Sequence, residues 1–166
     1  MKKSASLGDL LTKIESTLLG RNSRQAQLLN EREEAKPLGR TLILVVEPDK
    51  EIEREYQRVF SDAGYDLKVV SCVTDAVKQL KNARFDCIIV DVDLPDMAGY
   101  NAVSVIKTIE QKANIIITAA RNTKELEARI REEDIFYYYI KSFDREELKL
   151  AVQSALTRSE REVNAQ

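Results

Sequence analysis

Short apolar runs alternate with amphipathic segments over most of the chain, from Thr41 onward. Runs of Val, Ile, Leu and Tyr residues are typical of strands buried in a sheet. Apolar residues spaced three and four apart, as between Ile52 and Ala63, are typical of one buried helical face. The predicted strands are residues 41–47, 67–71, 86–91, 114–119 and 136–141. The predicted helices lie at about residues 52–63, 74–80, 102–109, 126–130 and 144–155.

Strands that alternate with helices are joined by crossover connections, and such connections make the sheet parallel. Right-handed crossovers then place helices on both faces of the sheet. The pattern therefore predicts an α/β fold with a doubly wound, five-stranded parallel sheet. In sheets of this kind ligands bind at the carboxyl ends of the strands.

Three polar residues are predicted to begin helices. Pro48 holds the residue before it in an extended conformation, which ends the first strand and leaves Asp49 free to cap the first of these helices. Thr74 is predicted to cap the next helix. Asp144, with Glu147 three residues later, gives the last helix a start that resembles a capping box.

The first 40 residues have a different pattern, because the apolar residues within 7–18 lie on one helical face and a charged segment follows. We therefore divide the chain into a helical N-terminal extension and linker at 1–40, a domain at 41–157 and a C-terminal tail at 158–166. The extension is expected to pack on the domain or to form a homodimer.

Composition narrows the classes of function. The 166 residues carry a net charge of −2, which gives no electrostatic reason to expect nucleic-acid or membrane binding. No apolar run is long enough for a secretory signal or a membrane span, so a cytoplasmic protein is expected. Histidine is absent from these residues, which excludes Ser-His and Cys-His nucleophile pairs and histidine metal sites.

Polar residues that could carry the remaining chemistry lie at the ends of four predicted strands: Glu47, Asp91, Thr118 and Lys141. This set suits phosphoryl transfer onto a carboxylate. Asp91 would attack phosphorus while a divalent cation held by neighbouring acids offsets the charge. Thr118 and Lys141 would hydrogen-bond the phosphoryl oxygens.

These residues lie in segments that resemble the receiver domain of bacterial two-component response regulators over about residues 41–157. The segments are ILVVEPDKEI, DCIIVDVDLPDMAGY, NIIITAARN and YYYIKSFDREEL. In the second, the most specific one, Asp91 is followed by Asp93, by a Leu-Pro pair and then by Gly99. The resemblance implies a flavodoxin-like sheet of strand order 2-1-3-4-5, with Asp91 as the phosphoacceptor.

The resemblance also implies roles for other strand-end residues and a type of partner. Thr118 and Lys141 would contact the phosphoryl group, and Thr118 and Tyr138 would be the switch residues. The phosphoryl group would come from a histidine kinase or a phosphotransfer protein. The protein would not be an enzyme beyond its own phosphorylation, and as a stand-alone receiver it would act by binding other proteins.

Two departures from the family pattern weaken the predicted site. The implied metal ligands are Glu47, Asp91 and the backbone carbonyl of Asp93, but Pro48 stands where the family has a second acid. Mg²⁺ binding is therefore expected to be weak or absent.

The second departure is Ser142, which replaces the proline that follows the family's lysine. The lysine–proline bond is commonly cis in the family, whereas a cis bond before serine costs about 3–4 kcal/mol. We therefore expect a trans bond after Lys141, a displaced loop, and a lysine that reaches Asp91 less directly.

Two other functions fit parts of the pattern. Pro48 favours a pseudo-receiver, a phosphorylation-independent module for protein interaction or dimerisation. The Asp-x-Asp motif at Asp91 is also found in haloacid-dehalogenase-type phosphatases. Those enzymes begin their fold near the motif and need a later acidic pair, whereas here two strand–helix units precede Asp91.

Overall fold

The structure is a computed structural model, and it describes residues 40–141 and 144–165. These residues form a parallel sheet of five strands in the order β2-β1-β3-β4-β5, which confirms the expected topology. The strands are β1 (Leu42–Val46), β2 (Asp66–Val70), β3 (Cys87–Asp91), β4 (Ile115–Ala119) and β5 (Tyr137–Ile140). The observed ends differ from the predicted ones by about one residue.

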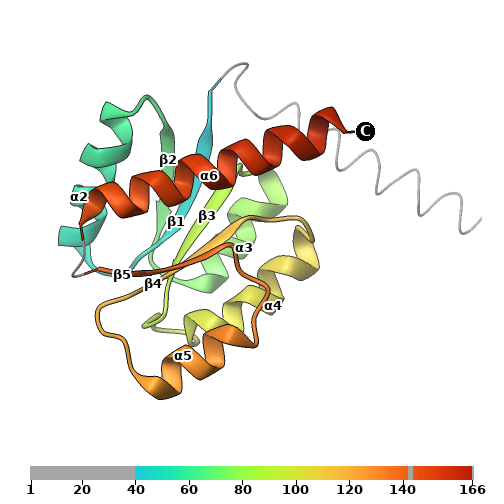
Figure 1. Cartoon of the computed structure of the whole chain (residues 1–166). Coiled ribbons are helices and arrows are strands. Elements are labelled where there is room, and N and C mark those ends of the chain that lie inside the picture. The colour runs from blue at the N-terminus through green and yellow to red at the C-terminus, as the bar shows by residue number, and fades with distance from the viewer. Residues whose placement is uncertain (1–39, 142–143, 166) are drawn as a thin grey trace, which may run out of the picture.

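Helices cover both faces of the sheet, so the predicted doubly wound arrangement is also confirmed (Figure 1). The helices are α2 (Lys50–Asp62), α3 (Val73–Asn82), α4 (Gly99–Ile109), α5 (Lys124–Arg131) and α6 (Arg145–Asn164). Apolar residues of α2 and α6 pack on one face, and those of α3, α4 and α5 pack on the other. The right-handed crossovers of a parallel sheet produce this division.

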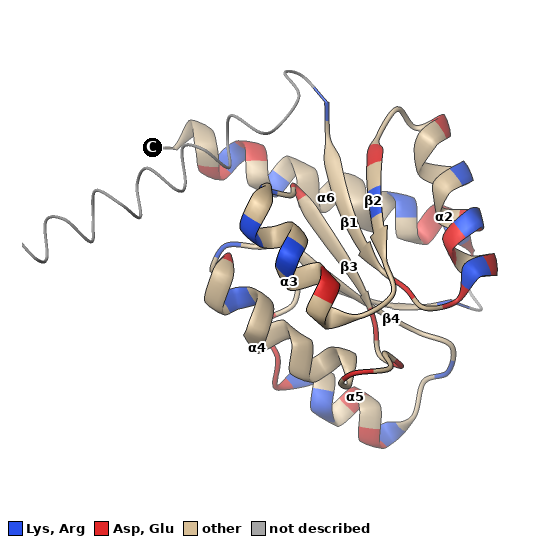
Figure 2. Ribbon diagram, turned by 180° about the vertical axis from the view of Figure 1, so that it is seen from behind, with Lys and Arg blue, Asp and Glu red and all other residues tan. Residues whose placement is uncertain are grey.

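The central strands β1, β3 and β4 are buried along almost their whole length, whereas β2 is half-buried. This burial explains their continuous apolar sequences, because both of their faces are covered by helices. In Figure 2 the strands are mostly free of charge, and the charged residues lie on the helices and on the loops at the strand ends.

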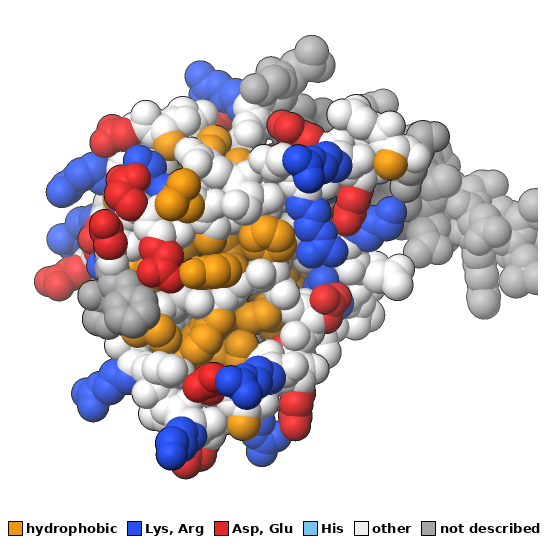
Figure 3. Space-filling model, viewed as in Figure 1, with side chains coloured by type: hydrophobic (Ala, Val, Ile, Leu, Met, Phe, Trp, Pro, Cys, Tyr) orange, Lys and Arg blue, Asp and Glu red, His pale blue; other side chains and the backbone are white. Residues whose placement is uncertain are grey.

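The strand β5 forms the edge of the sheet opposite β2, and it lies between α6 and α5 (Figure 1). Figure 3 shows apolar side chains gathered over this side of the molecule. Phe136 and Tyr137 are half-buried here and pack against the core on the α2 and α6 face.

Two of the three predicted helix caps are confirmed. The Asp49 carboxylate accepts from the N–H groups of Glu51 and Ile52, and the Asp144 carboxylate accepts from that of Glu146. Each satisfies backbone donors that have no partner within the first turn.

The prediction for Thr74 is wrong, because α3 begins one residue earlier, at Val73. The carboxylate of Asp96, in the loop after β3, accepts from the N–H groups of Val73 and Thr74 at 3.0 and 2.9 Å. The Thr74 hydroxyl donates to the same carboxylate at 2.9 Å. The cap therefore comes from a residue 22 positions away from Thr74, which the local sequence pattern could not indicate.

The predicted helical extension, the division at residue 40 and the homodimer concern residues 1–40, of which 1–39 lie outside the described part of the chain. They remain predictions. Within the described ranges, none of the helices has the length and apolar character that a membrane span requires.

Candidate functional site

Strand alternation places the four predicted site residues on the same face of the sheet. Successive side chains of a strand point to opposite faces. Ile43 and Val45, Ile89, Ile116 and Tyr139 belong to the core beneath α2 and α6. Glu47, Asp91, Thr118 and Lys141 each stand two residues after one of these core residues, at the carboxyl edge of that face.

Lys141 joins the two acids directly. Its Nζ lies 2.5 Å from Asp91 Oδ2 and 2.7 Å from Glu47 Oε2. Thr118 Oγ1 donates to Asp91 Oδ2 at 3.3 Å. The expectation that Lys141 would reach Asp91 less directly is therefore wrong. The trans bond predicted before Ser142 remains a prediction, since Ser142 lies outside the described residues.

The remaining oxygen of each acid is bonded to the backbone of the following turn. Asp93 N–H donates to Asp91 Oδ1 at 2.7 Å, and Asp49 N–H donates to Glu47 Oε1 at 3.0 Å. The side chains of Glu47 and Asp91 are only 2% and 4% exposed. The acids are thus held in one orientation by a lysine on one side and by backbone donors on the other.

Burial and charge act in opposite directions on these groups. Burial raises the pKa of Glu47, although contacts with Lys141 and the Asp49 N–H oppose the rise. Burial lowers the pKa of Lys141, but hydrogen bonds and charge from Asp91 and Glu47 outweigh it, so this pKa is raised. Lys141 is therefore a positively charged ammonium group at neutral pH, placed between two carboxyl groups.

Gly99 is required by a close approach of two backbones at the site. It is the first residue of α4, and its N–H donates to the Val92 carbonyl at 2.9 Å. A Cβ at this position would lie 2.1 Å from the backbone oxygen of Asp91. Only glycine therefore fits without displacing the end of β3 that carries the Asp91 side chain.

The residues at the site fit a divalent cation poorly. Pro48 has no side-chain oxygen, and the Asp49 carboxylate faces the N terminus of α2. Glu47 and Asp91 both direct an oxygen at the Lys141 ammonium. Across the described ranges there is no group of three or more His, Cys, Asp or Glu side chains placed to hold a metal. Two carboxylates that also bind a lysine supply few free oxygens for Mg²⁺, which prefers six oxygen ligands.

Tyr138 lies on the other face of the sheet from Thr118. It packs against the core beneath α3, α4 and α5, and its hydroxyl donates to Asn122 Oδ1 at 3.2 Å. The Tyr138 hydroxyl is thus bonded to the loop that follows β4, and its role as a switch residue remains a prediction.

A hollow of about 540 Å³ lies between the loop after β3 and the start of α5, lined by residues including Asp93, Tyr100 and Leu126.

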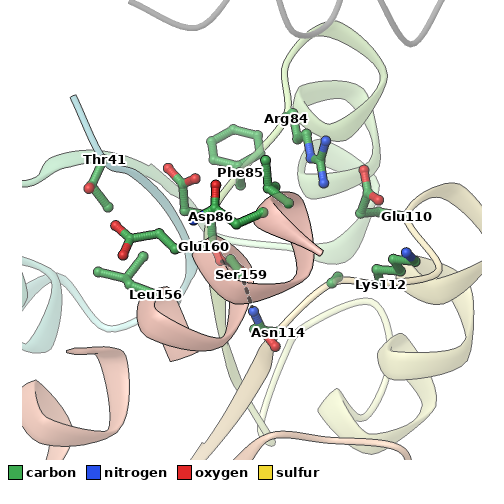
Figure 4. A pocket seen from close by; sticks show the side chains of 13 residues that line it. Thr41, Arg84, Phe85, Asp86, Glu110, Lys112, Asn114, Leu156, Ser159 and Glu160 are labelled. Carbon is green, nitrogen blue, oxygen red and sulfur yellow. Dashed lines mark hydrogen bonds between the residues drawn. The ribbon is translucent and has the colours of Figure 1, made fainter. Parts of the chain in front are cut away.

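A second hollow, of about 470 Å³, lies at the opposite edge of the sheet, near the amino ends of β3 and β4 (Figure 4). There Asn114 Nδ2 donates to Ser159 Oγ at 2.6 Å and to the Ala155 carbonyl at 3.0 Å. These bonds join the start of β4 to α6. The length of the strands separates this hollow from Glu47, Asp91 and Lys141.

The sequence did not predict one residue that contacts the site. Arg145 donates to the backbone carbonyl of Lys141 at 2.6 Å and pairs with Glu55, which is 90 residues earlier in the chain. An arginine in the first turn of a helix carries no local signal for such a role. Only the fold brings α2 and the end of β5 together.

Comparison with known proteins agrees with this fold. The family model for the response regulator receiver domain matches residues 43–153. The chain therefore belongs to the response regulator receiver domain family, a module of two-component signalling.

Several curated relatives are transcription regulators. The chain is 29% identical over 114 residues to the DNA-binding transcriptional regulator NtrC of Azospirillum brasilense, a match that covers 69% of this chain and 24% of NtrC. It is 28% identical over 126 residues to the response regulator SaeR of Staphylococcus epidermidis, covering 71% of this chain and 51% of SaeR. The chain thus spans about a quarter to a half of the length of these relatives.

Solved structures are similar over most of the described residues. The signal receiver domain of an HD domain-containing protein from Pseudomonas fluorescens has a TM-score of 0.72 and 26% identity, covering 78% of this chain and 96% of that one. The response regulator TrrA of Thermotoga maritima, in complex with Mg²⁺-BeF, has a TM-score of 0.63 and 25% identity, covering 70% of this chain and 99% of that one.

Proposed function

We propose that Asp91 accepts a phosphoryl group in a two-component phosphorelay. The observation that supports this most is the arrangement around the Asp91 carboxylate at the carboxyl end of the central strand β3. Lys141 and Thr118 contact Oδ2, and the Asp93 N–H contacts Oδ1. These are donors of the kind that stabilise the oxygens of a transferring phosphoryl group.

In the proposed reaction a carboxylate oxygen of Asp91 forms a bond to phosphorus as the bond between phosphorus and the donor's leaving group breaks. Lys141 and Thr118 then donate to the phosphoryl oxygens. The donor would be a histidine kinase or a phosphotransfer protein, and the phosphorylated histidine must be supplied by that partner, because these 166 residues contain no histidine.

Mg²⁺, when bound, would offset negative charge on the phosphoryl group. Glu47, Asp91 and the backbone carbonyl of Asp93 would hold it, and the absence of a carboxylate at Pro48 makes this binding weak. TrrA, the similar response regulator from Thermotoga maritima, binds Mg²⁺ together with BeF. This supports Mg²⁺ binding by the present chain, although the pairing of both acids with Lys141 keeps that binding weak.

The pairing of Lys141 with both acids favours a second candidate function. The ammonium offsets part of the charge of Glu47 and Asp91 without any metal. With Pro48 beside them, this arrangement would suit a pseudo-receiver, which uses the fold for protein interaction without phosphorylation. The phosphatase interpretation is set aside, because the chain belongs to the receiver family.

Mass spectrometry distinguishes the two candidates. The protein is incubated with acetyl phosphate and Mg²⁺, and the intact mass is measured beside that of Asp91→Asn and of Asp134→Asn, a matched change at an exposed acid that pairs with Lys107 outside the site. We expect one added phosphoryl group in the natural protein and in Asp134→Asn, and none in Asp91→Asn. No addition to the natural protein, or addition that persists in Asp91→Asn, would refute phosphorylation at Asp91.

A further inference from the structure

Both backbone polar groups of Lys141 are held by hydrogen bonds. Its N–H donates to the Ala119 carbonyl of β4 at 2.8 Å. Its carbonyl accepts from Arg145 Nη1 at 2.6 Å. Because both bonds restrict the backbone of Lys141, they restrict the position from which its side chain reaches toward Asp91.

Arg145 makes three further contacts, and its side chain is only 25% exposed. Nη1 also donates to the Tyr139 hydroxyl at 2.7 Å. Nη2 donates to Glu55 Oε2 at 2.6 Å, and Nε pairs with Glu55 Oε1. We call this set, in which Arg145 joins Glu55, Tyr139 and the Lys141 carbonyl, the Arg145 bridge.

The shape of the guanidinium group makes this set of bonds feasible. Its N–H groups point outward in one plane, so two can meet a carboxylate while others bond elsewhere. A lysine ammonium is a compact point charge without this fork and cannot reproduce the arrangement. The hydrogen bond from Arg145 lowers the pKa of Glu55, so the pair is charged at neutral pH.

The Arg145 bridge joins three elements that meet beside Glu47 and Asp91. Glu55 lies on α2, Tyr139 belongs to β5, and Arg145 is the first residue of α6. Asp49, the N-cap of α2, donates its backbone N–H to Glu47. The bridge thus fixes the end of β5 relative to the helix that follows Glu47.

We propose that Arg145 is a positioning residue, which directs the Lys141 ammonium toward Asp91 by tying the Lys141 carbonyl to Glu55 of α2. Arg145 acts through Lys141 and does not contact Asp91 itself. The proposal rests on the proposed function, since the consequence of this positioning is the contact between Lys141 and the phosphoryl group.

The test compares Arg145→Gln, Arg145→Lys and Glu55→Gln with the natural protein. Arg131→Gln is the matched control, because Arg131 pairs with Glu127 in an exposed contact on α5. The NMR chemical shifts of the Lys141 side chain, recorded at one fixed neutral pH and without Mg²⁺, report its contact with the acids without any phosphorylation. The rate of phosphorylation by acetyl phosphate with Mg²⁺ is measured in parallel.

In Arg145→Gln we expect the Lys141 side-chain shifts to move toward those of a solvent-exposed lysine and the phosphorylation rate to fall about 10- to 100-fold, as for a misplaced catalytic contact. Arg145→Lys should behave in the same way. Glu55→Gln should change both in the same direction but less, and Arg131→Gln should change neither.

Two results would overturn the proposal. One is an unchanged set of Lys141 side-chain shifts in folded Arg145→Gln. The other is full recovery in Arg145→Lys, which would show that only a positive charge is needed. Should Arg145→Gln fail to fold, unchanged Lys141 side-chain shifts in Glu55→Gln would overturn it instead. Failure of the natural protein to take up a phosphoryl group would refute the proposed function, while the Lys141 side-chain shifts would still decide the role of Arg145.

Discussion

Replacing Lys141 by methionine would remove the ammonium group that lies between Glu47 and Asp91 while keeping an unbranched side chain of similar length. The two acids are only 2% and 4% exposed, so they would remain buried beside each other without Lys141. Removing one partner of a buried ion pair costs about 3–5 kcal/mol, because the other charge stays desolvated. We expect a loss near the lower end of this range at neutral pH, since the site lies at the edge of the sheet.

The expected loss depends on pH through Glu47. Burial raises the pKa of Glu47 in the folded state, and Lys141→Met removes contacts that oppose this rise. A carboxyl group with a raised pKa binds its proton more tightly in the folded protein than in the unfolded chain. Its destabilising effect is therefore absent below the unfolded pKa and grows as the pH rises through the folded pKa. The deficit should shrink as the pH falls toward 4.5, the ordinary value for glutamate.

Urea unfolding followed by circular dichroism, at neutral pH and at mildly acidic pH, measures this effect. Lys149→Met is the control, because Lys149 pairs with Glu146 at 3.2 Å near the surface and should contribute less than about 1 kcal/mol. Adding Glu47→Gln to Lys141→Met should restore part of the loss. The reasoning would be refuted if Lys141→Met were as stable as the natural protein at neutral pH, or if its deficit grew on acidification.

Three further predictions concern residues around the site. Gly99→Ala should lower the free energy of unfolding by about 1–3 kcal/mol, because the new Cβ would collide with the Asp91 backbone; an unchanged denaturant midpoint would contradict this. Asp96→Ala should lower the free energy of unfolding by about 1–2 kcal/mol, because α3 loses its cap. This contribution of Asp96 should be lost as the pH falls through its lowered pKa. Urea unfolding across acidic pH measures both effects, and equal stability of the two proteins would show that the cap is unimportant. Pro48→Asp should strengthen Mg²⁺ binding in an NMR titration and lower stability by about 0.4–1 kcal/mol; equal affinity of both forms would show that Pro48 does not limit the metal site.

Much of the site could be predicted from the sequence, because it depends on two local regularities. Side chains alternate along a strand, and parallel strands end at the same edge of their sheet. Glu47, Asp91 and Lys141 end apolar runs, and Thr118 lies one residue before such an end. Their convergence follows from these positions once the strands are known to be parallel.

The sequence by itself thus determined the class of fold, the strand order implied by the family resemblance, and the residues that meet at one edge. It did not determine how they are held. Lys141 reaches both acids although no proline follows it, and Asp96 caps a helix that begins 23 residues before it. Arg145 meets Glu55 across 90 residues of chain. The packing of α2 and α6 against the sheet brings Arg145 and Glu55 together, and the loop after β3 brings Asp96 to the start of α3. Because these contacts join residues far apart in the chain, no local pattern of residues encodes them.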